Sequence, residues 1–265
     1  MDRPMFNGPL AIVAGPPRSG TTWLNREICD RPGWGTLLPE CTLLTQQIAL
    51  YNRTHLFCDA ARFGAYFGTK AALRALYHGI TAEMLGLIAD INHLNSADVL
   101  VLKDPELSLY LDDLDDLLPA HKLVCLVRDP RDVIASMKKV ALRKAEVWDA
   151  RKTSEWVFRY YWGIQNFAQN AGPNAVFVRY EDAVAGGLDG VRDFLGQDRA
   201  PFVATQGDYA SVKSSLDRKD PFFSDLYLKP TSQEAVGSYK RLLVSAEIKV
   251  IEHMYSSLMA KWGYK

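Results

Sequence analysis

The feature that most constrains this chain is an alternation of short apolar runs with longer stretches of helical periodicity. Four runs rich in Val, Ile and Leu have the length of single strands, and they lie at residues 10–14, 98–102, 122–127 and 175–178. Runs that are apolar on both faces are typical of parallel strands covered by helices on both sides. The sequence therefore predicts an α/β fold, with a central parallel sheet flanked by helices.

Segments with apolar residues at three- and four-residue intervals fill the spaces between these runs. We expect helices at residues 21–29, 60–89, 132–147, 155–168 and 245–260. Little periodicity is found over residues 211–238, which are predicted to form a loop. No repeat or low-complexity linker divides the chain, so we expect a single domain over residues 1–265 with a helical insertion around residues 41–95.

The composition argues against several classes of protein. The 31 Lys and Arg residues cancel the 31 Asp and Glu residues, so no global field draws the chain to nucleic acid or to an anionic membrane. No apolar run approaches the ~20 residues of a membrane helix, and the N-terminus does not read as a signal peptide. Four cysteines without CxxC spacing indicate neither a zinc site nor a disulfide framework. We expect a cytoplasmic protein that binds neither nucleic acid nor membrane.

The first motif, residues 15–22, follows the first apolar run and precedes a predicted helix. Its glycines have the spacing of a Walker-type phosphate loop, but the lysine that should follow the second glycine is replaced by Thr21. Backbone N–H groups in such a loop, together with the positive helix N-terminus, bind an anion. Arg18 supplies a forked guanidinium cation in place of the lysine. The absence of that lysine argues against an ordinary kinase or NTPase. The alternative is a simple turn followed by a helix cap.

The second motif, residues 128–136, follows the third apolar run. Arg128 lies at the strand end, and Ser136 lies about two turns into a helix that begins near Pro130. A cation and a hydroxyl in this arrangement could hold a further phosphate, and the alternative is a surface Arg–Asp pair beside an amphipathic helix. Because ligands bind beyond the carboxyl ends of parallel strands, the two motifs are expected to meet at one edge of the sheet.

The sequences PPRSGTTWL and LVRDPRDVIASM together resemble the signature of the sulfotransferases that use 3′-phosphoadenosine 5′-phosphosulfate (PAPS). The resemblance extends over roughly residues 9 to 182 and implies a P-loop-like sulfotransferase architecture. It also implies that the first motif holds the 5′-phosphosulfate and the second the 3′-phosphate. The cofactor ligands implied are Pro17, Arg18, Ser19, Gly20, Thr21, Thr22, Trp23, Arg128 and Ser136.

Sulfuryl transfer requires a base for the acceptor proton and positive charge beside the departing phosphate. Arg18 and Lys103 are candidates for the positive charge, and no metal is required. The cytosolic branch of the family has a Lys-Thr-His pattern where this chain has Lys103-Asp104-Pro105, so that histidine is absent. The chain therefore resembles the tyrosylprotein, carbohydrate and bacterial branch more closely, which implies Glu40 as the base. The alternative for Glu40 is a helix N-terminal acid, and the rival bases are His78 and His93.

Further contacts are implied at the fourth strand end and in the late polar segment. Tyr180 is expected near the adenine, with a packed core tyrosine as the alternative. Lys229 and Lys240 are candidate phosphate ligands, with solvated lysines as the alternative. An acceptor pocket is expected from residues 43–51 and 57–91, which are rich in aromatic side chains.

The sequence thus predicts transfer of a sulfuryl group from PAPS to a hydroxyl of a small molecule or saccharide, leaving adenosine 3′,5′-bisphosphate. Two other functions stay open from the residues alone. One is an atypical P-loop kinase, which would need Mg²⁺. The other is a non-catalytic protein that binds adenosine 3′,5′-bisphosphate. The oligomeric state is not predicted.

Overall fold

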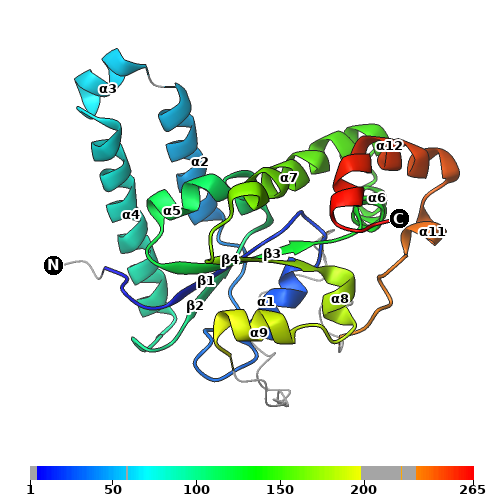
Figure 1. Cartoon of the computed structure of the whole chain (residues 1–265), viewed down its shortest axis with the longest axis horizontal. Helices are drawn as coiled ribbons and strands as arrows, with labels where there is room; N and C mark the ends of the chain where they lie inside the picture. The colour runs from blue at the N-terminus through cyan, green and yellow to red at the C-terminus, as the bar shows by residue number, and fades with distance from the viewer. Residues whose placement is uncertain (1–4, 58, 198–221, 223–230) are drawn as a thin grey trace.

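A four-stranded parallel sheet forms the centre of the molecule (Figure 1). The computed structural model describes residues 5–57, 59–197, 222 and 231–265. The strand order is β2-β1-β3-β4. The strands are β1 (Leu10–Ala14), β2 (Leu100–Lys103), β3 (His121–Val127) and β4 (Ala175–Arg179). The predicted α/β class and its parallel sheet are confirmed, and β2 begins two residues later than expected and ends on Lys103.

Alternate side chains of each strand enter two separate hydrophobic cores, because successive residues of a strand face opposite sides of the sheet. Ala11 and Val13 of β1 pack with the first core, and Leu10 and Ile12 pack with the second. The first core includes side chains from α1 (Thr21–Cys29), α8 (Tyr180–Val184) and α9 (Asp189–Leu195). Both faces of the sheet are therefore buried, which explains why the strands read as continuous apolar runs.

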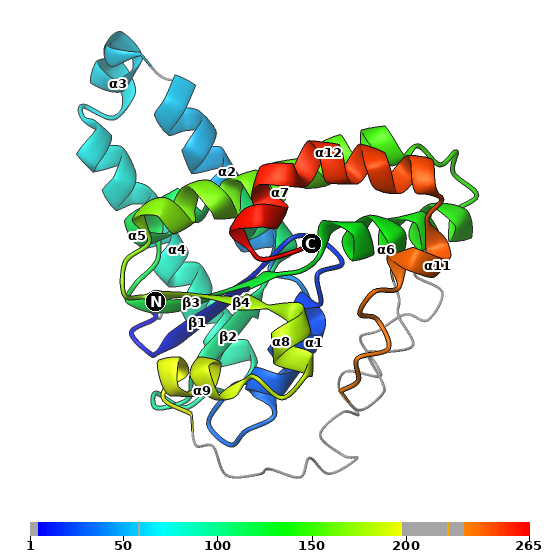
Figure 2. The ribbon, with the colours of Figure 1, turned by 45° about the vertical axis from the view of Figure 1, so that its right-hand side comes forward.

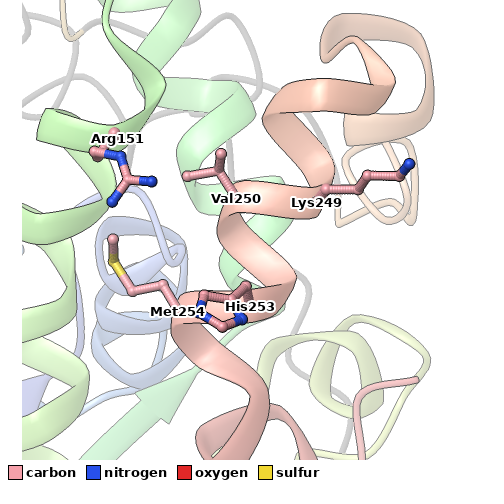
Figure 3. A pocket seen from close by; sticks show the side chains of 5 residues that line it. All are labelled: Arg151, Lys249, Val250, His253 and Met254. Atoms are coloured by element: carbon pink, nitrogen blue, oxygen red, sulfur yellow. The ribbon is translucent and has the colours of Figure 1, made fainter.

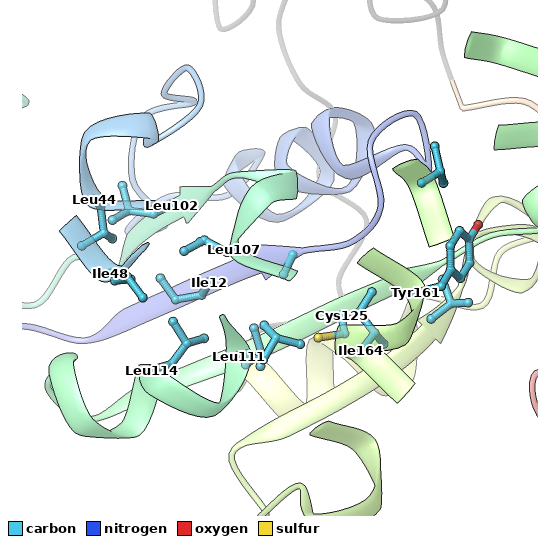
Figure 4. Close-up of a cluster of buried hydrophobic side chains, with 14 of the residues drawn as sticks. Ile12, Leu44, Ile48, Leu102, Leu107, Leu111, Leu114, Cys125, Tyr161 and Ile164 are labelled. Atoms are coloured by element: carbon cyan, nitrogen blue, oxygen red, sulfur yellow. The ribbon is translucent and has the colours of Figure 1, made fainter. Parts of the chain in front are cut away.

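The second core is larger and joins most of the remaining helices to the sheet (Figure 4). In this core Leu44, Ile48 and Ile164 pack around Ile12 and Cys125 of the strands. Its helices are α2 (Thr42–Phe57), α4 (Lys70–Ile91), α6 (Pro130–Arg143), α7 (Ala150–Asn170) and α12 (Ser245–Lys261). The described chain also contains the short elements η1 (Pro105–Leu109), η2 (Leu111–Asp113), α5 (Leu114–Leu117) and α11 (Tyr239–Leu242).

The single helix predicted over residues 60–89 is wrong. The structure has α3 (Ala60–Tyr66) and α4 there, separated by a turn in which Gly68 has a φ of 73°. The side chain of Thr69 caps α4 by accepting a hydrogen bond from the backbone N–H of Ala72. Together with α2, these helices form an arm, residues 42–91, that projects from the sheet (Figures 1 and 2).

The other predicted helices are confirmed, most of them with shifted ends. α1 has the predicted bounds, and α6 begins at Pro130 because the Asp129 side chain caps it by accepting from the backbone N–H of Arg131. α6 ends at Arg143, four residues before the predicted end. α7 starts five residues earlier than predicted, where the Asp149 side chain accepts from the backbone N–H of Lys152.

A close approach between α7 and η1 gives a test of this packing. A Cβ atom added at Gly163 would lie 2.2 Å from the carbonyl oxygen of Ser108. We expect Gly163→Ala to lower the free energy of unfolding by about 1–3 kcal/mol, the usual cost of overpacking. The matched control is Gly79→Ala in α4, where an added Cβ meets nothing within 4 Å. That variant should gain about 0.5–1 kcal/mol from helix propensity. Urea unfolding measures both, and an unchanged midpoint for Gly163→Ala would refute the close packing.

Candidate active site

The first motif forms a tight loop between β1 and α1. The backbone N–H of Ser19 donates to the carbonyl of Pro16 at 3.0 Å, and Gly20, with a φ of 104°, is the N-cap residue of α1. The backbone N–H of Gly15 donates to the Ser108 hydroxyl of η1 at 2.9 Å. Ser19 is fully buried, and its Oγ has no hydrogen-bond partner among the residues that the structure describes. The loop thus presents a buried, unsatisfied hydroxyl at the N-terminus of a helix.

The second motif meets the first, as the strand order requires. Arg128, 6% exposed, follows β3 and donates from Nη1 to the carbonyl of Arg18 at 3.1 Å, across 110 residues of sequence. Its Nη2 donates to the carbonyl of Ala235 at 2.6 Å. Its Nε is buried and has no partner within the described ranges. Two hydrogen bonds therefore fix the guanidinium in place, and its Nε–H donor is left without a partner among the described residues.

The Arg18 side chain joins the two motifs directly. Its Nε donates to the Ser136 hydroxyl of α6 at 3.1 Å, and its Nη1 donates to the carbonyl of Phe222 at 2.6 Å. The cation predicted for one anion and the hydroxyl predicted for the other therefore lie side by side. We call Arg18, Ser19, Arg128 and Ser136 the anion cradle. Two motifs far apart in sequence form it together.

Asp132 lies on the first turn of α6, within the second motif. In the structure it is 1% exposed and lies 3.8 Å from Nη2 of Arg128. Its carboxylate also accepts hydrogen bonds from the backbone N–H groups of Gly237 and Tyr239 and from the Ser238 hydroxyl, at 2.8, 2.9 and 3.0 Å. Asp132 therefore holds the segment that follows Ala235 over the cradle. Nothing in the local spacing could have indicated partners more than a hundred residues away.

Tyr180 lies between the first loop and Arg128. The guanidinium carbon of Arg128 is 4.5 Å from the centre of the Tyr180 ring, and Trp23 meets that ring edge-on at 5.6 Å. A Cβ atom at Gly20 would lie 2.7 Å from the same ring, so only glycine fits there. Burial raises the pKa of the Tyr180 hydroxyl, although the Arg128 charge opposes the shift. The ring is a packed support for the cradle, and its contact with adenine stays a prediction.

Lys103 and Glu40 form an ion pair at the end of β2. The Nζ of Lys103 donates to Oε1 of Glu40 at 2.8 Å and to the Thr22 hydroxyl of the first motif at 3.2 Å. The Lys103 side chain is 5% exposed, whereas that of Glu40 is 51% exposed. A buried cation needs a partner of this kind, since an unpaired one is costly. The structure thus brings together the residues predicted as base and charge stabiliser, and it ties them to the phosphate loop.

The other predicted residues lie apart from this pair. His78 is on α4 and His93 follows it, and neither takes part in the contacts that hold Glu40 and Lys103. Lys240 is exposed on α11, with its ammonium group 5.9 Å from the ring of Tyr239. Lys229 lies outside the described residues.

Two aromatic residues of the predicted acceptor pocket belong to the core. Tyr51 is 2% exposed and its hydroxyl donates to Asp116 at 2.9 Å, and Phe63 is 4% exposed. Tyr66, in contrast, is 81% exposed on α3. The acceptor pocket as a whole stays a prediction.

A separate surface pocket of about 550 Å³ lies between α7 and α12 (Figure 3). Its lining is formed by Arg151, Lys249, Val250, His253 and Met254, none of which was predicted for the site. Among the described residues, no cluster of three or more His, Cys, Asp or Glu side chains could hold a metal ion. Within the same ranges, none of the helices combines the length and apolar character of a membrane crossing.

Comparisons with solved structures show the same fold. The sulfotransferase domain from the curacin biosynthetic pathway aligns with a TM-score of 0.62 and 19% identity, covering 97% of this chain and 98% of that one. The sulfotransferase domain of the Synechococcus PCC 7002 olefin synthase aligns with a TM-score of 0.59 and 21% identity, covering 95% and 97%. A sulfotransferase from Mycobacterium avium gives a TM-score of 0.52 and 13% identity, covering 100% and 78%.

Among curated proteins, no significant match to the chain is found. A family model described as the sulfotransferase family matches residues 9–196, which include β1 to β4, both anion motifs, Glu40 and Lys103. The match covers well over half of the sequence. This chain therefore belongs to the sulfotransferase family.

Proposed function

We propose that the protein transfers a sulfuryl group from PAPS to a hydroxyl group of a small-molecule or saccharide acceptor, releasing adenosine 3′,5′-bisphosphate. The observation that carries the proposal is the anion cradle, in which Arg128 contacts Arg18 from a motif 110 residues away. Two anion-binding motifs that meet at neighbouring strand ends suit a nucleotide with anionic groups at both ends of its ribose. An NTPase loop would instead have its lysine where this chain has Thr21.

The residues of the cradle fit such a nucleotide. Ser19 Oγ and Arg128 Nε are buried donors with no partner among the described residues. Leaving a buried polar group unpaired costs about 1–3 kcal/mol, so an anionic ligand that accepts from both would recover that cost. Arg128 and Ser136 would hold the 3′-phosphate, and the loop from Pro17 to Trp23 would hold the 5′ side. Arg18 belongs to the loop and also contacts Ser136, so its guanidinium would lie near both the 5′ side and the 3′-phosphate.

Glu40 and Lys103 divide the chemistry between them. When bound, PAPS supplies a sulfuryl group on a phosphate oxygen that is ready to leave. The half-exposed Glu40 carboxylate is open to an acceptor arriving from solvent, and it takes the proton of the acceptor hydroxyl. The bond from sulfur to the acceptor oxygen forms as the bond from sulfur to the phosphate oxygen breaks, and that oxygen keeps the electron pair. The Lys103 ammonium, already bonded to Thr22 of the phosphate loop, stabilises the charge left there.

The arm, residues 42–91, is proposed as the acceptor side of one domain. Glu40 lies two residues before α2, so the base is at the foot of the arm. The exposed side chains of Leu43 and Leu50 give this side apolar surface that an acceptor can contact. On the basis of this surface we propose that the acceptor has an apolar part beside its hydroxyl group.

Replacing Arg128 tests the assignment of the 3′-phosphate. We expect Arg128→Ala to weaken binding of adenosine 3′,5′-bisphosphate by about 1.5–3 kcal/mol, the scale of a charged hydrogen bond. Binding of 5′-AMP should be nearly unchanged, because it lacks the 3′ group. Calorimetry measures both ligands, with Arg151→Ala as an exposed control outside the cradle. Equal losses for the two ligands would remove Arg128 from this role. A wild-type chain that prefers ADP to the bisphosphate would overturn the proposed function.

Replacing Glu40 tests the base. Glu40→Gln keeps the shape of the side chain and should lower kcat by ~10²-fold or more, with little change in nucleotide affinity. The assay is steady-state transfer of labelled sulfate from PAPS to a panel of hydroxyl acceptors. His78→Gln and His93→Gln are the matched controls and should turn over like wild type. Full activity of Glu40→Gln together with a loss in either histidine variant would move the base to that histidine.

A further inference from the structure

The short helix η1 contacts both halves of the candidate site. At one end, the Ser108 hydroxyl accepts from the backbone N–H of Gly15 in the phosphate loop at 2.9 Å. At the other end, the Asp104 side chain caps η1 by accepting from the backbone N–H of Glu106 at 2.9 Å. The second carboxylate oxygen of Asp104 accepts from the Thr45 hydroxyl of α2 at 2.8 Å. A single turn of chain after β2 is therefore bonded to the nucleotide side and to the helix that follows Glu40.

The first turn of α2 is attached to the end of β2 by two hydrogen bonds of different kinds. The backbone N–H of Cys41 donates to the carbonyl of Lys103 at 3.0 Å. The side-chain bond from Thr45 to Asp104 lies one turn further on, and both of these side chains are buried. Glu40 is the residue directly before Cys41. The two bonds therefore determine where the Glu40 backbone lies, and so where its carboxylate meets Lys103.

Loss of the Thr45–Asp104 bond is expected to disturb the local structure more than loss of an exposed hydrogen bond of the same length. Asp104 is 2% exposed, and this burial raises the pKa of its carboxyl group, while the bonds from Glu106 and Thr45 oppose the rise. A buried carboxylate that loses a donor is left partly unsatisfied, so the neighbouring chain must shift or admit water. The residues next to it are Lys103 and the first turn of α2. Loss of the bond is therefore expected to displace Glu40 relative to Lys103.

We propose that Thr45 and Asp104 are positioning residues for the base, and that their hydrogen bond places the Glu40 carboxylate against Lys103. The role in catalysis rests on the proposed function. Both side chains are buried, so they act through Glu40 and Lys103 and do not contact the acceptor. Because η1 also holds Gly15, the same turn aligns the base with the loop that binds the 5′ side of the nucleotide.

The test compares Thr45→Val with Thr45→Ser. Valine keeps the shape of threonine and removes the hydroxyl, whereas serine retains the hydroxyl and removes a methyl group. We expect Thr45→Val to lower kcat by ~10-fold or more through misplacement of the base, and Thr45→Ser to restore most of it. The KM for PAPS and the affinity for adenosine 3′,5′-bisphosphate should stay within about twofold of wild type, since the cradle is intact. A wild-type kcat for Thr45→Val, or an equal loss in both variants, overturns the proposal.

Cys41 provides a second measurement that does not depend on activity. Its thiol is partly buried, and burial raises its pKa to about 12, so alkylation in the wild type should be slow. Loss of the Thr45–Asp104 bond should loosen the first turn of α2 and speed alkylation of Cys41 several-fold in Thr45→Val, but not in Thr45→Ser. Cys29 on α1 is the internal control, and its rate should not change. Mass spectrometry of the labelled peptides measures the alkylation of Cys41 and of Cys29 separately.

The two measurements distinguish failure of the positioning role from failure of the proposed function. A wild-type chain that is inactive with PAPS overturns the proposed function, and Cys41 labelling then decides by itself whether the bond places the segment. Equal labelling of Cys41 in wild type and Thr45→Val overturns the positioning role, whatever the activity.

Discussion

The shared edge at which four parallel strands end is the constraint on which the site depends. The register pairs Val13 with Lys103, Ala14 with Cys125 and Val127 with Arg179, so the ends of the four strands lie within three residues of one another along the sheet. Only this arrangement brings Arg18 within hydrogen-bond distance of Arg128 and Ser136. The strands are mostly apolar on both faces. Lys103 is the last residue of β2, and Arg18, Arg128 and Ser136 belong to the segments that follow β1 and β3, whereas Glu40 lies just before α2. The sheet therefore determines the distances between the segments of the site, and the side chains at and after the strand ends provide its polar groups.

Charge in this protein is organised locally. The chain has a net charge of zero, yet two of its buried cations, Lys103 at the end of β2 and Arg128 after β3, lie on either side of β1 at the carboxyl ends of the strands. Each is near a carboxylate from another segment or turn, Glu40 at 2.8 Å and Asp132 at 3.8 Å. Removing a cation from water is expensive unless such a partner is present. These carboxylates pair with the cations in the absence of a ligand. Under the proposed function, a protein without net charge would bind a polyanionic nucleotide through this local group of cations.

The parts of the structure that the sequence predicted are those with a local physical signal. Strands 10–14 and 175–178, the loop around Gly20 and the start of α6 at Pro130 each follow from a few neighbouring residues. The break at Gly68 was missed because apolar spacing continues through it and one glycine does not outweigh that pattern. The roles of Asp132 and Thr45 were missed for another reason. Their partners lie 105 and 59 residues away, and no spacing rule connects them. The role of Glu40 as the base was implied only by family resemblance, and its contact with Lys103 was not predicted, because that geometry depends on the fold.

The two halves of the site are built differently, and this difference bears on how such an enzyme could change its acceptor. The anion cradle is fixed by loops that leave the sheet and by the buried Asp132. The Glu40 side depends on α2, which is joined to the body by side-chain bonds such as those of Thr45 and Tyr51. Under the proposed function, substitutions along the arm can alter the acceptor surface while the cradle keeps its nucleotide. They are tolerated only if the first turn of α2 stays in place, because a shift there moves the base away from Lys103. Substitutions that preserve the Thr45–Asp104 bond could then change the choice of acceptor, whereas substitutions that break it would reduce catalysis.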